Sequence, residues 1–396
     1  MSPVLDIDAL IGDPQIRIIV CCGAGGVGKT TTAAALGLRA AESGRQVVVL
    51  TIDPARRLAQ SLGLTMLDNT PRPVKGIDTA RGGSLDAMML DMKRTFDEVV
   101  EAHATAEKAQ QILANPFYQA VSSSFAGTQE YMAMEKLGQL RLEADRDPDN
   151  PRWDLIVVDT PPSRSALDFL DAPKRLGSFL DGRFIRLLSA PAKAGGRAYL
   201  KVFSAGVNVV TKTLTKVLGG QMLTDVQTFV AALDTMFGGF RKRADHTYAL
   251  LSDHTTTFIV VAAPERDALR EASFFVDRLD EEAMPLAGLV INRMYRVRAP
   301  GLSAARALGA AEELGERENE HSGGAESSGV SEHAAITQGL LRMHAVQAEV
   351  AARHESLAKR FIAGHPDIPT AEVPAASGDI HDLVGLRAVG EALASH

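Results

Sequence analysis

A glycine-rich loop close to the N-terminus has the residue types and the spacing of a phosphate-binding site. Residues 22–33 are CGAGGVGKTTTA, and from Gly23 onward they match G-x-x-x-x-G-K-[ST] without a gap. In this motif, successive backbone N–H groups point at the β-phosphate, and the N-terminus of the following helix adds a partial positive charge. Lys29 would reach the β- and γ-phosphate oxygens, and the Thr30 hydroxyl would bind Mg²⁺. The complete motif predicts a nucleotide site, rather than a glycine-rich turn with no ligand, formed by Gly23, Gly25, Gly26, Val27, Gly28, Lys29, Thr30 and Thr31.

Two aspartates end apolar runs elsewhere in the chain. Asp159 ends the run LIVVD, the place of the acid that holds Mg²⁺ through water in P-loop proteins, although such an aspartate can also cap a helix. Asp53 follows the run QVVVLTI, where a carboxylate could position or deprotonate the attacking water. The alternative for Asp53 is a turn-forming Asp-Pro pair, and spacing alone leaves the two interpretations open.

The elements that carry these residues predict an α/β fold. Residues 16–23 form a β-branched apolar run typical of a buried strand, residues 29–42 have helical composition, and residues 46–53 form a second buried run. This strand, loop, helix and strand make a βαβ unit. Further buried runs occupy residues 153–162, 256–265 and 285–293. We therefore expect a P-loop NTPase with a mainly parallel, doubly wound sheet and helices on both faces.

Long helical segments interrupt this core and predict an inserted helical subdomain. Apolar stripes run through residues 200–217 and 222–240, and they indicate either a closed helical core or an open groove for an apolar client helix. A polar segment rich in glycine and serine indicates a disordered linker at residues 315–333. The predicted organisation is ATPase core at 14–92, 149–175 and 251–314, helical insert at 93–148 and 176–250, and a C-terminal helix with final core elements, including an edge strand, at 334–396.

Composition excludes several classes of protein. The formal net charge of −7 gives no indication of nucleic-acid binding. The two cysteines, Cys21 and Cys22, are adjacent, so they form no CxxC clip and predict no zinc site. The acidic N-terminus does not resemble a signal peptide, and no apolar run is long enough to span a bilayer. We expect a cytoplasmic protein that reaches a membrane only through a partner.

Three segments in order resemble one family of ATPases. The loop GAGGVGKT, the segment TIDPA and the segment DTPPS resemble the ArsA/Get3-type ATPases, within the deviant Walker A group that includes MinD and ParA. The resemblance implies that the nucleotide is ATP, that Asp53 orients the hydrolytic water and that Asp159 belongs to switch II. It also implies that Asn292 contacts the adenine edge, and that two ATPase cores form a dimer below the helical insert.

The chain also departs from the family pattern. Ala24 occupies the position of the family's second loop lysine, so the charge clamp that this lysine supplies is missing. Either turnover is slow, the partner chain supplies a cation, or another cation of this chain substitutes. Arg56, Arg57 and Arg164 lie in or next to the switch segments, so one of them could act as the clamp, and the alternative is that they are ordinary surface arginines. The insert contains no cysteine, so it cannot form the family's arsenite-binding thiolate triad.

The sequence therefore predicts a Mg²⁺-dependent ATPase that couples its nucleotide state to a partner or client through the helical subdomain and is not an arsenite-pump subunit. The alternative is a nucleotide-dependent scaffold with negligible hydrolysis. Expected partners are ATP, a second copy or a paralogue in a dimer, and a hydrophobic protein client or membrane partner.

Overall fold

The computed structural model contains a single eight-stranded sheet within the part of the chain that it describes. That part comprises residues 3–52, 57–116, 118–119, 122, 128–147, 149, 151–161, 242–243, 245–321 and 328–395. Neighbouring strands are parallel, except that β3 pairs with β4 in antiparallel fashion. The strand order is β3 (Arg72–Pro73), β4 (Ser84–Met89), β2 (Gln46–Thr51), β5 (Leu155–Asp159), β1 (Ile18–Cys22), β6 (Thr256–Ala262), β7 (Leu286–Met294) and β8 (Thr370–Pro374).

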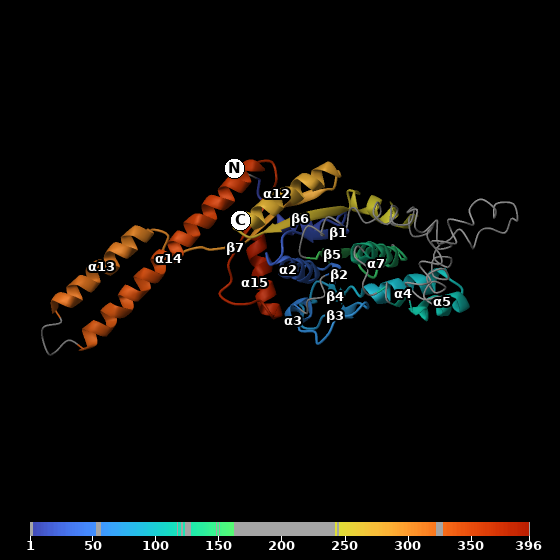
Figure 1. Cartoon of the computed structure of the whole chain (residues 1–396), viewed down its shortest axis with the longest axis horizontal. Coiled ribbons are helices and arrows are strands. Elements are labelled where there is room, and N and C mark those ends of the chain that lie inside the picture. Colours follow the sequence, from blue (N-terminus) through green and yellow to red (C-terminus); the bar gives the residue numbers. More distant parts are fainter. Residues whose placement is uncertain are drawn as a thin grey trace, which may run out of the picture.

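Helices cover both faces of this sheet (Figure 1). Side chains at alternate positions of the central strands point to opposite faces, so that Ile18 and Val20 enter one apolar cluster while Ile19 and Cys21 enter the other. One face packs against α1 (Ile7–Gly12), α2 (Lys29–Glu42), α3 (Arg57–Ser61) and α15 (Leu383–Ala394). The other packs against α4 (Met92–His103), α5 (Ala106–Leu113), α7 (Thr128–Ala144), α12 (Arg266–Glu281) and the end of α14 (Ser328–Gly364). The predicted doubly wound α/β fold is confirmed.

The predicted disordered linker at 315–333 is wrong at both of its ends. Helix α13 (Ala304–His321) continues through residues 315–321, and α14 already includes residues 328–333. Polar composition is shared by linkers and by solvated helices, and here the pair between Arg317 Nη2 and Glu313 Oε1 supports a helix at the i, i+4 spacing. The edge strand predicted near the C-terminus is confirmed as β8. The apolar stripes at 200–217 and 222–240 lie outside the described residues.

Helices α13 and α14 form a hairpin arm that extends away from the sheet (Figure 1). Gln338 Nε2 donates to the carbonyl of Ala311 at 2.8 Å, and the ring of His344 contacts the carbonyl of Leu302 at 2.7 Å. The arm follows the C-terminal end of β7. The glycine-rich loop follows the C-terminal end of β1, and because these strands are parallel, both segments leave the sheet at the same edge. Among the described helices, none has the length and hydropathy of a membrane span.

Arg45 joins three segments that are distant in sequence. Its side chain is 11% exposed, and its Nε atom donates to Asp154 Oδ1 at 2.7 Å. Its other nitrogens donate to the carbonyls of Ile11, Asp13, Ile16 and Asp154. A planar guanidinium with fixed donors can satisfy such a ring of acceptors. Arg45 therefore fixes the N-terminal segment against the start of β5.

Candidate active site

The glycine-rich loop connects the end of β1 to the start of α2, as a P-loop requires. Three of its glycines have a positive φ: Gly23 at 146°, Gly26 at 77° and Gly28 at 99°. A Cβ added to Gly23 would lie 2.1 Å from the carbonyl oxygen of Val261 on β6, so the loop approaches that strand too closely for a side chain. Gly25 and Gly26 are exposed at the loop tip, whereas Val27 is buried beneath it. The loop thus presents backbone at its surface.

Lys29 lies across its own loop. Its side chain is buried, and Nζ donates to the carbonyl of Ala24 at 2.8 Å. Thr30 and Thr31 follow it in the first turn of α2, where backbone N–H groups have no partner within the helix. The ammonium and the helix N-terminus therefore both face the loop, the arrangement that binds a polyphosphate. Ala24 itself is buried.

Asp159 links the loop to two neighbouring strands. Its Oδ2 atom accepts a hydrogen bond from Thr30 Oγ1 at 2.8 Å and another from Thr51 Oγ1 at 2.8 Å. The carboxylate is fully buried. Hydroxyl and carboxylate oxygens are the ligands that Mg²⁺ prefers, so Thr30 and Asp159 fit the ion that the sequence predicts. The sequence analysis missed Thr51, although a hydroxyl residue at the C-terminal end of a strand in a P-loop chain was a usable signal.

Asn292 contacts the glycine-rich loop from β7. Its Nδ2 atom donates to the carbonyl of Val27 at 2.8 Å, and a Cβ added to Gly28 would lie 2.2 Å from the same atom. Its Oδ1 atom accepts from the backbone N–H of Arg293 at 2.9 Å. Arg293 has a φ of 61°, a left-handed conformation that costs a non-glycine residue energy, and β7 shifts its register with β8 here. The structure therefore brings Asn292 to the loop; its contact with adenine stays a prediction.

The remaining predicted site residues lie outside the described side chains. Asp53, Arg56 and Arg164 belong to the undescribed residues, and Arg57 begins α3 without a described side chain. Ile52, the residue before Asp53, lies next to Asp159, because its backbone N–H donates to the backbone carbonyl of Asp159 at 3.0 Å.

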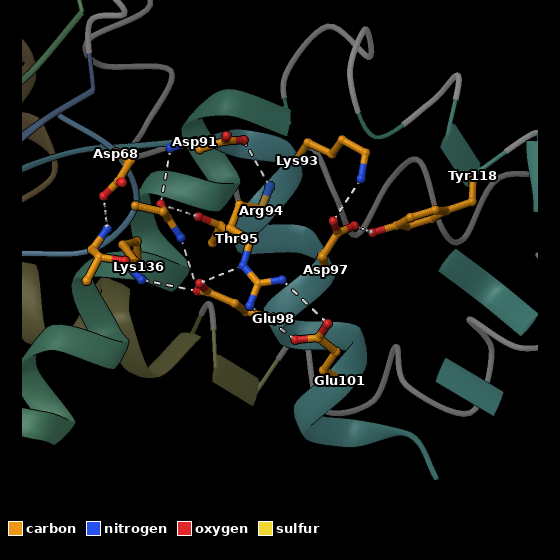
Figure 2. A network of polar contacts seen from close by, with 12 residues as sticks. Asp68, Asp91, Lys93, Arg94, Thr95, Asp97, Glu98, Glu101, Tyr118 and Lys136 are labelled. Atoms are coloured by element: carbon orange, nitrogen blue, oxygen red, sulfur yellow. Dashed lines mark hydrogen bonds and ion pairs between the residues drawn. The ribbon is translucent and has the colours of Figure 1, made fainter. Parts of the chain in front are cut away.

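A buried polar network connects the core to the helices that follow β4 (Figure 2). Asn69 Oδ1 accepts from Thr95 Oγ1 at 3.0 Å, and Asn69 Nδ2 donates to Glu98 Oε2 at 3.1 Å. The same Glu98 oxygen pairs with Lys136 Nζ on α7 at 3.1 Å. Asn69 Oδ1 also accepts from the backbone N–H of Asp91, just before α4. The network therefore joins a loop of the core to two helices of the first helical block, and no motif in the sequence pointed to it.

The adjacent thiols lie beneath the loop on β1. Cys21 and Cys22 are free and fully buried, and they point to opposite faces of the sheet. Burial raises the pKa of Cys22 to about 12, and burial together with the Asp159 carboxylate raises the pKa of Cys21 well above its ordinary value. Both side chains are therefore packed as small apolar groups.

Comparison with known proteins agrees with this geometry. The family model of the anion-transporting ATPases matches residues 16–299. ATPase GET3C of Arabidopsis thaliana is 24% identical over 294 residues, 71% of this chain and 67% of the relative. ATPase GET3 of Malassezia globosa is 24% identical over 286 residues, 72% of this chain and 75% of the relative.

ATPase BagA of Mycobacterium tuberculosis is 28% identical over 171 residues, 42% of this chain. The chain spans about half the length of that relative, 48%. The family match, in contrast, covers the glycine-rich loop, both aspartates and Asn292, and more than half of the chain. The chain therefore belongs to the family of anion-transporting, ArsA-type P-loop ATPases.

Proposed function

We propose that this chain binds Mg-ATP at the glycine-rich loop and hydrolyses it to ADP and phosphate. The observation that carries the proposal is the shared carboxylate oxygen of Asp159, which Thr30 and Thr51 hold directly behind the loop. A buried carboxylate fixed by two hydroxyls is suited to orienting a hydrated cation. We assign ATP as the nucleotide because the chain belongs to a family of ATPases.

Each residue of the site has one proposed role. Backbone N–H groups of the loop bind the β-phosphate, and Lys29 exchanges the carbonyl of Ala24 for phosphate oxygens. Thr30 and Asp159 would hold Mg²⁺, Asp159 through water, and the ion would supply positive charge that offsets the negative charge developing on the transferred phosphate. Asp53 orients the attacking water, and Asn292 exchanges the carbonyl of Val27 for the adenine edge.

We further propose that the nucleotide state reaches the helical block through Asn69. The loop that contains Asn69 follows α3, and α3 begins four residues after Asp53 in the chain. A shift of that segment on hydrolysis would move an amide bonded to both Thr95 and Glu98. The helical block would then bind a partner or a hydrophobic client in one nucleotide state. The absence of cysteine from the insert supports a role other than arsenite export.

A second candidate is a nucleotide-dependent scaffold with negligible hydrolysis, acting as a dimer with a paralogue. Ala24 favours it, because this side chain is buried and apolar where the family resemblance implies a second lysine. Losing a cation near the transferring phosphate costs orders of magnitude in rate.

Steady-state hydrolysis of Mg-ATP by the purified full chain, with ATP binding measured in parallel, tests both candidates. For an ATPase, Lys29→Ala and Asp53→Asn each reduce turnover at least about hundredfold. ATP binding by the unaltered chain without turnover would reject hydrolysis and favour the scaffold. Ala24→Lys is the matched variant, since restoring the cation should raise turnover only if its loss limits the rate.

A further inference from the structure

Arg293 interrupts the regular geometry of β7. Its φ of 61° is one of only two positive φ values among the described non-glycine residues. At the same place β7 contains one residue more than the neighbouring strand. Ile291 pairs with Glu372, and three residues further along β7, Met294 pairs with Pro374, which is only two residues further along β8. Such a bulge is rare between parallel strands, and a bulge changes the direction of the side chain that it carries.

The bulge keeps Arg293 out of the apolar core. Alternate residues of a strand point to the same face, so a regular β7 would place Arg293 on the face of Ile291. That face is covered by α12 and the end of α14, and Ile291 is buried there. Instead, Met294 enters the same apolar cluster three residues after Ile291, and Arg293 is exposed. The extra residue therefore brings an arginine side chain to the surface at the end of the strand.

The strained residue lies beside the glycine-rich loop. Its neighbour Asn292 donates from Nδ2 to the carbonyl of Val27 at 2.8 Å. The Oδ1 atom of the same amide accepts from the backbone N–H of Arg293 at 2.9 Å. One side chain therefore holds both the loop and the strained peptide. Backbone strain persists where the surrounding structure enforces it, and it is concentrated at functional sites.

The guanidinium of Arg293 is an unpaired cation at this edge of the sheet. Among the described residues, no carboxylate lies within ion-pair distance of it, whereas Arg296, three residues further on, pairs with Glu372 at 3.8 Å. Residues 22–33 supply one cation only, Lys29. A nucleoside polyphosphate carries several negative charges, so a second cation next to the loop is complementary to it.

We propose that Arg293 binds phosphate oxygens of a nucleotide held in the glycine-rich loop of the same chain. The proposal rests on the nucleotide binding proposed above but not on hydrolysis, so it applies to an ATPase and to a scaffold alike. The planar fork of an arginine suits bidentate contact with a phosphate group. Asn292 and the bulge position that fork, and the strained backbone is retained because the ligand needs the arginine there.

Binding of Mg-ATP and of inorganic tripolyphosphate to the purified full chain tests the proposal. Arg293→Asn removes the cation, and asparagine tolerates a left-handed backbone. The expected result is a loss of at least about tenfold in affinity for both ligands, because a hydrogen-bonded contact between charged groups is lost. Arg296→Asn is the matched control. It removes a neighbouring exposed arginine that pairs with Glu372 and should leave both affinities within about twofold.

Tripolyphosphate separates contact with the phosphates from contact with the nucleoside. If Arg293→Asn weakens the binding of ATP but not of tripolyphosphate, the residue contacts the nucleoside. If it weakens neither ligand, it lies outside the site. Either result overturns the proposal, and so does a failure of the unaltered chain to bind tripolyphosphate.

Lys29→Ala distinguishes failure of this proposal from failure of the proposed function. If the unaltered chain binds no ATP, or binds it equally well after Lys29→Ala, the nucleotide site itself is rejected and the role of Arg293 falls with it. If Lys29→Ala abolishes binding while Arg293→Asn has no effect, the nucleotide site stands and only the role of Arg293 is rejected.

Thermal unfolding without nucleotide separates ligand binding from a role in the fold. Arg293→Gly should keep or raise the melting temperature of the ligand-free chain, because glycine adopts a positive φ without strain. Its affinity for both ligands should fall as it does in Arg293→Asn. A lower melting temperature in Arg293→Gly would mean that the arginine stabilises the fold, and it would overturn the proposal.

Discussion

Thr51 and Asp159 are register partners on adjacent parallel strands, and the Thr51 hydroxyl donates to Asp159 Oδ2 at 2.8 Å. The same oxygen accepts from Thr30. One atom therefore connects the ends of β2 and β5 with the first turn of α2. This relationship makes Thr51 a positioning residue for the carboxylate.

Replacing Thr51 with valine should reduce ATP turnover about tenfold and raise the Mg²⁺ concentration needed for half-maximal rate, because one of the two hydrogen bonds that orient Asp159 is lost. Thr256→Val is the matched control. That hydroxyl is also buried, but it bonds the carbonyl of Leu250 at the opposite end of the sheet. Equal Mg²⁺ dependence in the two variants would contradict the role of Thr51.

Asn69→Ala should lower the free energy of unfolding by about 2–3 kcal/mol, because the buried partners Thr95 and Glu98 lose hydrogen bonds. Glu101→Ala provides the comparison, since its contact with Arg94 at 3.4 Å is exposed and should contribute less than about 1 kcal/mol. Urea unfolding of both variants measures the difference. If Asn69→Ala lowers the free energy of unfolding no more than Glu101→Ala does, the hydrogen bonds of Asn69 contribute little to stability.

Arg45→Met should be among the most destabilising single substitutions, at about 3–5 kcal/mol, because it leaves the Asp154 carboxylate and several carbonyls without their donor. Arg39→Met removes an exposed pair with Asp8 and should cost about 1 kcal/mol or less. Thermal unfolding distinguishes the two, and equal melting temperatures would refute the structural role given to Arg45.

Acid should weaken the attachment of the arm through His354. Burial, reinforced by Arg353, lowers the pKa of this imidazole below its ordinary value of 6.5. The folded chain therefore binds its proton less readily than the unfolded chain. The stabilisation is complete above pH 6.5 and is lost as the pH falls through the lowered value. The melting temperature of the unaltered chain should thus fall more steeply below pH 6.5 than that of the His354→Gln variant. If the two plots of melting temperature against pH run parallel, protonation of His354 does not destabilise the fold.

Neither cysteine should react with a thiol reagent in the folded chain at neutral pH. Cys21 and Cys22 are inaccessible, and the pKa of Cys22 is raised to about 12, so almost no thiolate is present. Both should react once the chain is unfolded. A Val384→Cys variant, at an exposed position on α15, provides the reactive reference. Rapid labelling of the unaltered chain would mean that β1 opens under native conditions.

The fold was predictable where the sequence carried long apolar runs. β1, β2, β5, β6 and β7 are buried on both faces, and such strands have nearly continuous apolar sequence. β4 was missed because SLDAMM mixes polar and apolar positions. The two ends of the segment predicted as a linker, residues 315–321 and 328–333, were misassigned because a polar, glutamate-rich sequence resembles a disordered segment until a second helix packs against it.

The site was predictable only as far as its motif. The glycine-rich loop could be predicted because its chemistry fixes its spacing, and Asp159, which the structure places in contact with Thr30, could be predicted because it ends a buried strand. Thr51 and the contact between Asn292 and Val27 depend on which strands become neighbours, and a single sequence does not contain that information.

The position of β1 has a consequence for how the chain is made. β1 lies between β5 and β6, yet Leu155 and Thr256 are synthesised long after Cys22. During synthesis, β1 has no strand partner on either edge until β5 emerges from the ribosome, and its second edge stays unpaired until β6 emerges. Such late, long-range pairing slows folding and leaves apolar edges open to wrong partners. The nascent chain should therefore depend on chaperones until Thr256 has left the exit tunnel.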